Sequence, residues 1–331
     1  MFDLTRRGFA TLLGGAAAAW PLAARAQERE KVRRIGVMAS LAADDRVAQI
    51  RNGAFLQGPQ QAGWNVGRNV SIEYRWAGIG EAARRHAAEL VALAPDVILA
   101  GGSQAATPLL QITQTIPVVF VHTPDPVGSG LVSSLAQPGG NATGFTQFEY
   151  GIAGKWLELL KQIAPTTTRA AVARDAAITA GIGQWAAIQS VAPVLGMQVI
   201  PINLQSAAEI ERSIADFART PNGGLIVTGS GLSVFHLNLL VKLAAQHKLL
   251  AVYYERSFVA AGGLISYGAD LVDQYRHAAG YVDRILKGEK PANLPVQAPT
   301  RYETVVNLRT AKTLGITMPP SVLARADEVI E

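Results

Sequence analysis

The sequence contains no cysteine among its 331 residues. This absence excludes disulfide bonds, thiolate zinc sites, iron–sulfur clusters, cysteine nucleophiles and a lipid anchor on an N-terminal cysteine. Charged residues are also sparse, at 17%, and the formal net charge is only +5. Because lysine and arginine are scattered, no basic stripe is available to follow a nucleic acid backbone. We therefore expect no nucleic acid partner.

Several motifs of nucleotide-dependent and metal-dependent enzymes are missing as well. The sequence has neither a G-x-x-x-x-G-K-[ST] loop nor an H-E-x-x-H pair, which excludes P-loop nucleotide hydrolysis and the usual zinc hydrolases. Short glycine patterns at 78–83 and 181–186 resemble a dinucleotide fingerprint, but such patterns are common in a chain with 32 glycines. No cofactor and no metal are predicted.

Residues 1–26 are typical of an export signal. Arg6 and Arg7 are followed by Phe9 and by an uncharged, alanine-rich stretch that ends at a small-x-small cleavage site, Ala24-Arg25-Ala26. The paired arginines resemble the twin-arginine signal, and an ordinary secretory signal is the alternative. We expect a mature chain that begins at Gln27 and is periplasmic, soluble and without a lipid anchor.

Apolar runs alternate with helix-like segments along nearly the whole mature chain. Strands are predicted at 33–39, 70–76, 97–100, 117–121, 170–173, 198–202, 225–227, 251–253 and 264–266. Helices are predicted near 47–62, 81–93, 104–113, 154–163, 182–195, 207–218, 234–247 and 271–286. This alternation predicts an α/β fold of two doubly wound lobes with parallel central sheets. Stretches 124–148 and 291–299 are rich in glycine or proline, which favours connections between the lobes.

The residues that follow the predicted strands form the candidate ligand-binding site, because open α/β sheets bind ligands beyond the carboxyl ends of their strands. These residues are Ser40, Ser103, Gln104, Thr123, Asp125, Thr146 and Gln147 in the first lobe, and Asp175, Ser230, Glu255 and Tyr267 in the second. Ser103 begins a predicted helix, where its hydroxyl and free amide groups favour a carboxylate. Asp175 and Glu255 favour a cation. An aromatic ring, from Tyr267 or Phe148, is suited to an apolar part of the ligand.

Each candidate also has a purely structural interpretation. Ser103 can cap its own helix, Tyr267 can pack between the lobes, and the two acids can pair with their neighbours Arg174 and Arg256. A catalytic alternative uses the same serine, since Gly101-Gly102-Ser103-Gln104-Ala105 resembles the G-x-S-x-G elbow of serine esterases. The chain has no His-Gly-Gly oxyanion segment, and its five histidines have no evident acidic partner. No catalytic residue is therefore predicted, and an esterase that uses Ser103 is the alternative of another class.

Eight short motifs lie between residues 33 and 331. They are RIGV at 34–37, IEYRW at 72–76, TIPVVF at 115–120, DPVG at 125–128, PGGNATG at 138–144, GGLISYG at 262–268, YVDRILKG at 281–288 and PPSVL at 319–323. These motifs, in this order, resemble the tryptophan/tyrosine-type ABC transporter substrate-binding protein family. The resemblance implies a type I periplasmic binding protein fold, in which the chain crosses between the lobes three times and the solute is trapped by hinge closure.

The resemblance also implies how the chain is divided and what it works with. The first lobe is expected to comprise 27–147 and about 268–292, and the second lobe 148–267 and about 293–331. The implied function is solute capture for an ABC importer: the protein is expected to be a monomer that delivers a small carboxylate-bearing solute, an amino acid or aromatic acid, to an inner-membrane permease. Presentation of the ligand to a membrane sensor is the alternative. Many family members have an Asn-Pro pair where this chain has Asp175-Ala176, and a carboxylate there favours a cationic group on the ligand.

Overall fold

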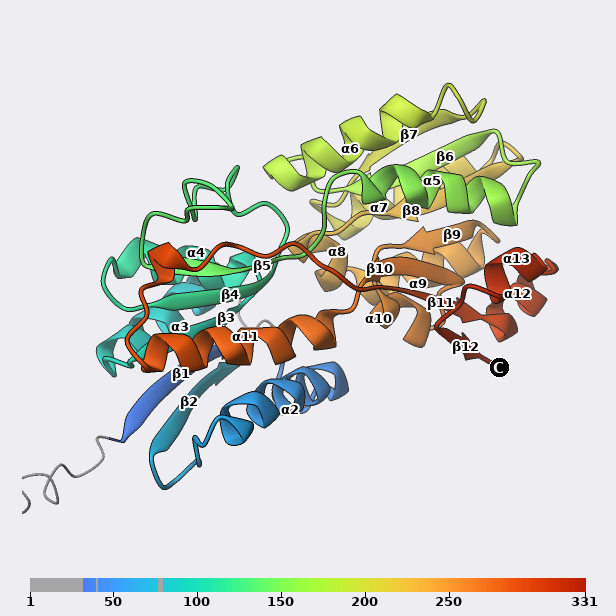
Figure 1. Cartoon of the computed structure of the whole chain (residues 1–331). Helices are drawn as coiled ribbons and strands as arrows, with labels where there is room; N and C mark the ends of the chain where they lie inside the picture. Colours follow the sequence, from blue (N-terminus) through green and yellow to red (C-terminus); the bar gives the residue numbers. More distant parts are fainter. Residues whose placement is uncertain (1–31, 40, 77–79) are drawn as a thin grey trace, which may run out of the picture.

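The chain forms two α/β lobes, each built on its own sheet, in the computed structural model, which describes residues 32–39, 41–76 and 80–331 (Figure 1). The first sheet has five strands in the order β2-β1-β3-β4-β5, and the second has seven in the order β12-β11-β10-β9-β8-β6-β7. Neighbouring strands pair in parallel, except that β10 and β11 are antiparallel. The predicted fold class, two doubly wound lobes with parallel central sheets, is confirmed.

The first lobe combines the first part of the chain with one helix from much later. Its elements are β1 (Arg33–Ala39), α2 (Arg46–Gln61), β2 (Val70–Trp76), α3 (Glu81–Ala92), β3 (Val97–Gly101), α4 (Ser103–Ile112), β4 (Val118–Thr123), β5 (Ala142–Thr146), α11 (Leu271–Leu286) and the 3₁₀ turn η1 (Pro291–Asn293). Successive residues of β3 and β4 face opposite sides of the sheet. Ile98 and Phe120 pack toward α3 and α4, whereas Leu99 and Val121 pack toward α2 and α11.

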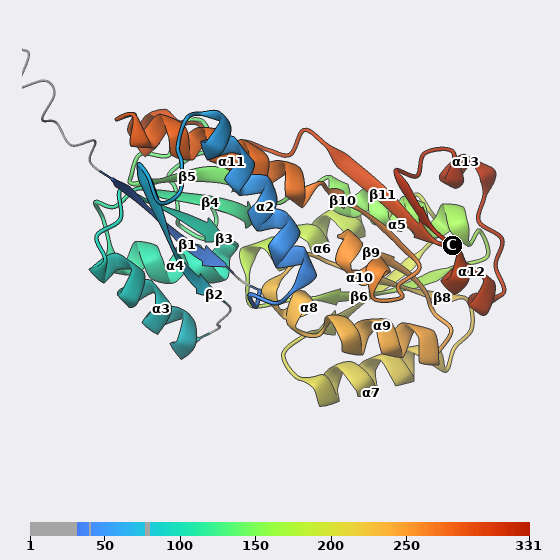
Figure 2. The ribbon, with the colours of Figure 1, turned by 90° about the horizontal axis from the view of Figure 1, so that it is seen from below.

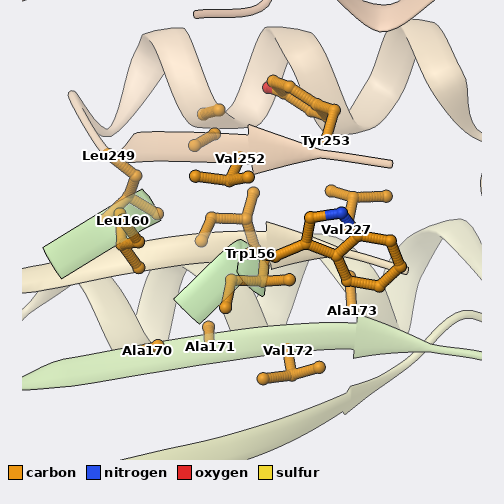
Figure 3. Packing of buried hydrophobic residues seen from close by; sticks show 14 of the residues in the cluster. Trp156, Leu160, Ala170, Ala171, Val172, Ala173, Val227, Leu249, Val252 and Tyr253 are labelled. Carbon is orange, nitrogen blue, oxygen red and sulfur yellow. The ribbon is translucent and has the colours of Figure 1, made fainter. Parts of the chain in front are cut away.

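The second lobe contains the larger sheet and the C-terminal segment. Its elements are α5 (Ile152–Ile163), β6 (Arg169–Arg174), α6 (Thr179–Val191), β7 (Gln198–Asn203), α7 (Ala207–Ala218), β8 (Gly223–Val227), α8 (Gly231–Phe235), α9 (Leu237–Gln246), β9 (Leu250–Tyr253), α10 (Arg256–Ala260), β10 (Ile265–Ala269), β11 (Tyr302–Asn307), α12 (Leu308–Leu314), α13 (Pro320–Leu323) and β12 (Glu328–Ile330). Figure 3 shows Trp156 and Leu160 of α5 packed over β6, β8 and β9. Helix α5 is therefore fixed to the centre of this sheet.

Three connections join the lobes. The chain leaves the first sheet after β5 and enters α5, returns between β10 and α11, and crosses again between η1 and β11. Figures 1 and 2 both show α11 lying along α2 of the first lobe, although β10 and β11, its neighbours in the sequence, belong to the sheet of the second lobe. A Cβ on Gly58 of α2 would lie 2.3 Å from the Cβ of Ala279 in α11, so glycine permits this close packing.

Two local expectations differ from the structure. The stretch 124–148 was expected to be a connection, but it contains β5, an edge strand of the first sheet. The small residues of β5 give it little resemblance to a strand in the sequence. At position 144 a Cβ would lie 1.9 Å from the carbonyl oxygen of Phe120, so only glycine fits at this position. The helix expected near 234–247 is two helices, α8 and α9, which meet at His236.

Two other predictions lie outside the described residues: the export signal at 1–26 and the candidate site residue Ser40. Within residues 32–39, 41–76 and 80–331, no helix combines the length and the apolar character that crossing a membrane requires.

Candidate functional site

A cavity of about 360 Å³ lies between the lobes, and we call it the interlobe cavity. Its first-lobe wall comprises Leu41, Ala42, Gly101, Gly102, Ser103, Gln104, His122, Pro124 and Gln147. Its second-lobe wall comprises Asp175, Ile178, Ser230, Gly231, Leu232, Val234, Phe235 and Tyr254. The lining residues that directly follow a strand are Gly102, Pro124, Gln147, Asp175 and Tyr254, and Figure 2 shows α8 of the second lobe at the boundary with the first. The cavity therefore occupies the place where open α/β folds bind their ligands.

The two walls touch, so the structure is a closed arrangement of the lobes. A Cβ on Gly231 of the second lobe would lie only 2.0 Å from Nε2 of Gln104 in the first. No side chain fits at this position of α8 unless Gln104 moves. The interlobe cavity is consequently bounded by both lobes.

The first-lobe wall presents the N-terminus of α4. The residue before the helix, Gly102, has φ 85° and offers no side-chain cap. The helix's own hydrogen bonds begin at Ala105 and Ala106, which both donate to the carbonyl oxygen of Gly102. The amide groups of Ser103 and Gln104 thus belong to the turn that has no acceptors within the helix, and the helix dipole favours negative charge there. The structural interpretation of Ser103 was that it caps its own helix. In the structure Ser103 is the first helical residue, and no side chain caps α4.

The second-lobe wall presents a buried carboxylate, that of Asp175 at the end of β6. Its side chain is 6% exposed, and its Oδ1 accepts a hydrogen bond from the backbone of Ala177 at 3.0 Å. Among the described residues no cation forms an ion pair with it. The neighbouring Arg174 guanidinium instead lies 5.3 Å above the ring of Trp185. A Cβ on Gly181 would lie 1.8 Å from the carbonyl oxygen of Asp175, so the start of α6 is pressed against this residue.

Ser230 and the adjoining turn are held by groups of the second lobe itself. The Ser230 hydroxyl caps α8 by accepting a hydrogen bond from the backbone of Ser233 at 3.0 Å. The completely buried Gln184 of α6 binds both backbone groups of Gly229: its amide nitrogen donates to the carbonyl at 3.1 Å and its oxygen accepts from the amide at 2.8 Å. Gln184 therefore positions this part of the wall, and the sequence analysis missed it.

A bulge at the end of β4 places His122 on the cavity wall. The β4–β5 register shifts between Phe120 and Thr123, and His122 has φ 61°, a conformation that is uncommon for residues other than glycine. Its backbone amide donates to Oε1 of Gln274 in α11 at 3.0 Å. Its Nε2 lies 2.8 Å from Nε2 of Gln147, another wall residue. Burial lowers the pKa of His122, and the nearby Glu255 offsets this effect only in part.

Five predicted site residues lie outside the cavity lining: Thr123, Asp125, Thr146, Glu255 and Tyr267. Thr123 and Thr146 end β4 and β5 and are buried behind the wall. The Thr146 hydroxyl has no hydrogen-bond partner, and that of Thr123 reaches only the carbonyl of Val121, at 3.5 Å. Neither residue belongs to the lining of the interlobe cavity.

Asp125 and Tyr267 are engaged in other contacts. Asp125 accepts hydrogen bonds from the Tyr150 hydroxyl at 2.7 Å and from the Gly128 amide at 2.8 Å. The ring of Tyr267 lies 5.8 Å from that of Tyr302, inside the second lobe. The other suggested aromatic cover, Phe148, is 5% exposed and packs edge-on against Trp156.

Glu255 is the centre of a buried charged cluster, formed with Arg51 and His122, behind the cavity. Its Oε2 lies 3.6 Å from Nη2 of Arg51 and 3.4 Å from Nε2 of His122, and the hydroxyl of Ser257 donates to its other oxygen. Burial alone would raise the pKa of Glu255, but His122, Arg51 and Ser257 outweigh it and lower the pKa to about 2. The carboxylate is therefore ionised, and its partner is not the adjacent Arg256, which pairs with Glu303 and Glu328.

Sequence reasoning missed three further wall residues: His122, Tyr254 and Phe235. Tyr254 directly follows β9, so the strand-end rule identified its neighbour Glu255 but not the residue that lines the cavity. Its hydroxyl is buried without a hydrogen-bond partner of good geometry. Phe235 is 64% exposed at the end of α8 and supplies the aromatic surface expected from other residues. Phe235 lines the cavity because α8 ends there and a separate helix, α9, begins after His236. The sequence pattern predicted one continuous helix and did not reveal this break.

Among the described residues of the site, metal chemistry would use a cluster of metal-binding side chains, and covalent chemistry would use a contact between Ser103 and a histidine. No group of three or more histidine, aspartate or glutamate side chains suited to a metal ion occurs in the part of the chain that the structure describes. Ser103 and His122 both line the cavity, but no hydrogen bond joins them, so the elbow-like motif has no assembled base beside it.

Several known proteins resemble this chain in sequence and fold. The chain matches the family described as ABC transporter substrate binding protein over residues 34–330. It is 24% identical over 263 residues to a tyrosine-binding protein of Clostridioides difficile, which covers 79% of this chain and 75% of that protein. A conserved domain protein from Vibrio cholerae is similar with a TM-score of 0.82 and 26% identity, covering 90% of this chain and 100% of that one.

A further solved structure includes a ligand. It is an ABC domain from Streptococcus pneumoniae in complex with L-Trp, similar with a TM-score of 0.82 and 25% identity, and the match covers 90% of this chain and 99% of that one. The family match spans both lobes and all the strands that surround the interlobe cavity. This chain belongs to the ABC transporter substrate-binding protein family.

Proposed function

We propose that this protein captures a free amino acid with a large apolar side chain outside the cytoplasm and delivers it to an ABC permease. The observation that carries the proposal is the opposite polarity of the two cavity walls. The α4 N-terminus with Ser103 and Gln104 favours a carboxylate, and Asp175 across the cavity favours an ammonium group. A zwitterion satisfies both walls at once, so its binding favours the closed arrangement.

The remainder of the cavity lining suits an apolar side chain. Leu41, Ile178, Leu232, Val234 and Phe235 contribute apolar surface from both lobes. The relatives support an aromatic amino acid, since one is named for tyrosine binding and another was solved with L-Trp. L-tryptophan, L-tyrosine and L-phenylalanine are therefore the first ligands to test.

Calorimetry with matched ligands tests the assignment of each wall. L-tryptophan is expected to bind with a dissociation constant of roughly 1 μM or below, which corresponds to about −8 kcal/mol. Tryptamine lacks the carboxylate and indole-3-propionate lacks the ammonium group, so both should bind much more weakly. If none of the three aromatic amino acids bound, the proposed ligand class would be wrong.

Substitution of Asp175 tests the ammonium site directly. Asp175→Asn keeps the shape but removes the charge, and should weaken L-tryptophan binding by roughly 10- to 100-fold, the value of a hydrogen bond to a charged group. It should leave the binding of indole-3-propionate unchanged, because that ligand has no ammonium group. Asp216→Asn, on the exposed face of α7, is the matched control. Equal losses for both ligands would contradict this assignment.

Export and the transport partner are also part of the proposal. The family assignment supports a location outside the cytoplasm, and the predicted signal at 1–26 contains Arg6 and Arg7. Replacing both arginines by lysine should retain the protein in the cytoplasmic fraction if it uses the twin-arginine route.

We expect a monomer that passes its solute on unchanged. Loss of solute uptake on deletion of a permease encoded beside it would support that partner.

A further inference from the structure

The buried cluster of Arg51, His122 and Glu255 joins one lobe to the other. Glu255 belongs to the second lobe, between β9 and α10, whereas Arg51 lies on α2 and His122 at the end of β4 in the first lobe. Their side chains are 5% (Glu255), 7% (Arg51) and 10% (His122) exposed. All three groups belong to the chain, so the contact itself includes no atom of a solute.

The two oxygens of Glu255 have different roles. Oε1 is satisfied within its own lobe by the hydroxyl of Ser257. Oε2 faces the first lobe, where it accepts no hydrogen bond of good geometry, and the Nε of Arg51 likewise lacks a partner. What holds Oε2 is the charge of Arg51 at 3.6 Å and the ring of His122 at 3.4 Å. The interaction therefore depends on the position of one lobe relative to the other.

Because the contact between Glu255 and Arg51 is buried, its loss has a large energetic cost. A charge taken out of water is stable only beside a compensating charge, and removing one partner leaves the other buried and unpaired. Arg51 supplies that compensation when the lobes are together. The phenols of Tyr254 and Tyr275 also lie near Glu255, but burial raises the pKa of both, so they add no charge at neutral pH.

We propose that Glu255 sets the balance between the open and closed lobes, because its contact with Arg51 and His122 holds the lobes together before a solute binds. The low pKa of Glu255, about 2, supports this role, since it keeps the carboxylate charged. Closure without solute means that less binding energy is spent on conformational change, which strengthens apparent affinity in proportion to the closed fraction. The inference takes closure as the capture step of the proposed function, but it is independent of which solute is bound.

The absence of cysteine allows a clean distance measurement on the ligand-free protein. Ala88 on α3 and Ala208 on α7 are exposed, and Figure 2 shows these helices on the side of the molecule away from α11. Spin labels on Ala88→Cys and Ala208→Cys should report a short distance when the lobes are closed. With Glu255→Gln, the ratio of closed to open molecules should fall by roughly tenfold or more. Glu328→Gln removes the same charge from a pair with Arg256 inside the second lobe, and should leave the distances unchanged.

A second variant distinguishes a closure contact from a merely structural one. Arg51→Met should produce the same shift toward long distances, and the double variant Arg51→Met/Glu255→Gln should be no more open than the more open single variant, because both act through one contact. Unchanged distances in folded Glu255→Gln and Arg51→Met proteins would overturn the inference, as would a lower melting temperature without any change in distance. Because no solute is present, these outcomes leave the calorimetric test of the proposed function unaffected.

Discussion

Two carboxylates link the lobes of this protein, and their surroundings differ. Glu255 is buried behind the interlobe cavity and faces Arg51 and His122 across the lobe boundary. Asp125, in a half-exposed turn after β4, accepts a hydrogen bond from Tyr150 just before α5. Water can replace the partner of Asp125 when the contact breaks, but it cannot easily replace the partners of Glu255 while the lobes are closed. Burial, rather than the number of contacts, should decide which link matters.

The largest effect is expected when the guanidinium of the buried cluster is removed. Arg51→Met leaves the Glu255 carboxylate without its compensating charge, which should lower the free energy of unfolding by about 3–5 kcal/mol. Urea denaturation followed by circular dichroism measures this loss. Arg51→Met/Glu255→Leu should regain most of it, since no unpaired charge is then buried.

The outcome that would contradict this expectation is a double variant as unstable as Arg51→Met alone. The loss would then come from the packing of the Arg51 stem against its neighbours and not from the unpaired carboxylate. The matched control is Arg84→Met, because Arg84 pairs with Glu81 on the exposed surface of α3. It should change the stability by less than about 1 kcal/mol.

The same cluster should make stability depend on pH through His122. Burial lowers the pKa of His122 in the folded protein, while Glu255, Arg51 and Gln147 surround its ring. Below about pH 6.5, the ordinary value, the unfolded chain binds this proton and the folded chain does not. Stability is thus complete above that pH and falls as the pH decreases. Thermal melts between pH 8 and 5 should show a shallower decline for His122→Gln, and an identical slope would contradict this prediction.

The sequence was sufficient to predict most of the fold. The predicted bounds 33–39, 70–76, 207–218 and 271–286 coincide with β1, β2, α7 and α11, because apolar periodicity is strong in these segments. Prediction from the sequence failed where tertiary packing, and not the local pattern of apolar residues, determines the secondary structure. Strand β5 contains Gly144 and carries little strand propensity. After residue 300 the elements are short, and the two strands depend on distant pairing: β11 pairs with β10, and β12 with β11.

The candidate site could be predicted only as far as the strand-end rule extends. That rule identified Ser103, Gln104, Gln147, Asp175 and Ser230, which line the interlobe cavity, and their contacts with solute stay a prediction. It could not identify His122, whose direction follows from a bulge. Nor could it pair Arg51 with Glu255, because nothing local in either segment records a contact between residues so distant in sequence.

A third carboxylate, that of Glu303, extends the comparison. It pairs with Arg256, as Glu255 pairs with Arg51, but its pKa is raised whereas that of Glu255 is lowered. Burial raises the pKa of Glu303 to about 7; Arg256 opposes this, and Asp270, Glu328 and Asp327 add to it. The ionised form is therefore disfavoured, and stability that is complete below about pH 4.5 is lost as the pH rises through 7. Glu303→Gln should raise the melting temperature at pH 8 by roughly 2–4 °C, the shift that about 1 kcal/mol gives in a lobe of this size. No gain is expected at pH 4.5.

The smallest effect is expected at the exposed link. Burial raises the pKa of Asp125, but hydrogen bonds from Tyr150 and Gly128 outweigh it, and the pKa is lowered overall. Tyr150→Phe removes the hydroxyl that joins Asp125 to the second lobe, while the ring keeps its packing against Gly183. Stability should fall by less than about 1 kcal/mol, and the distance between labels at Ala88 and Ala208 should not change. A loss as large as that of Arg51→Met would mean that the lobes are held at the rim of the boundary, and that burial does not decide the strength of these links.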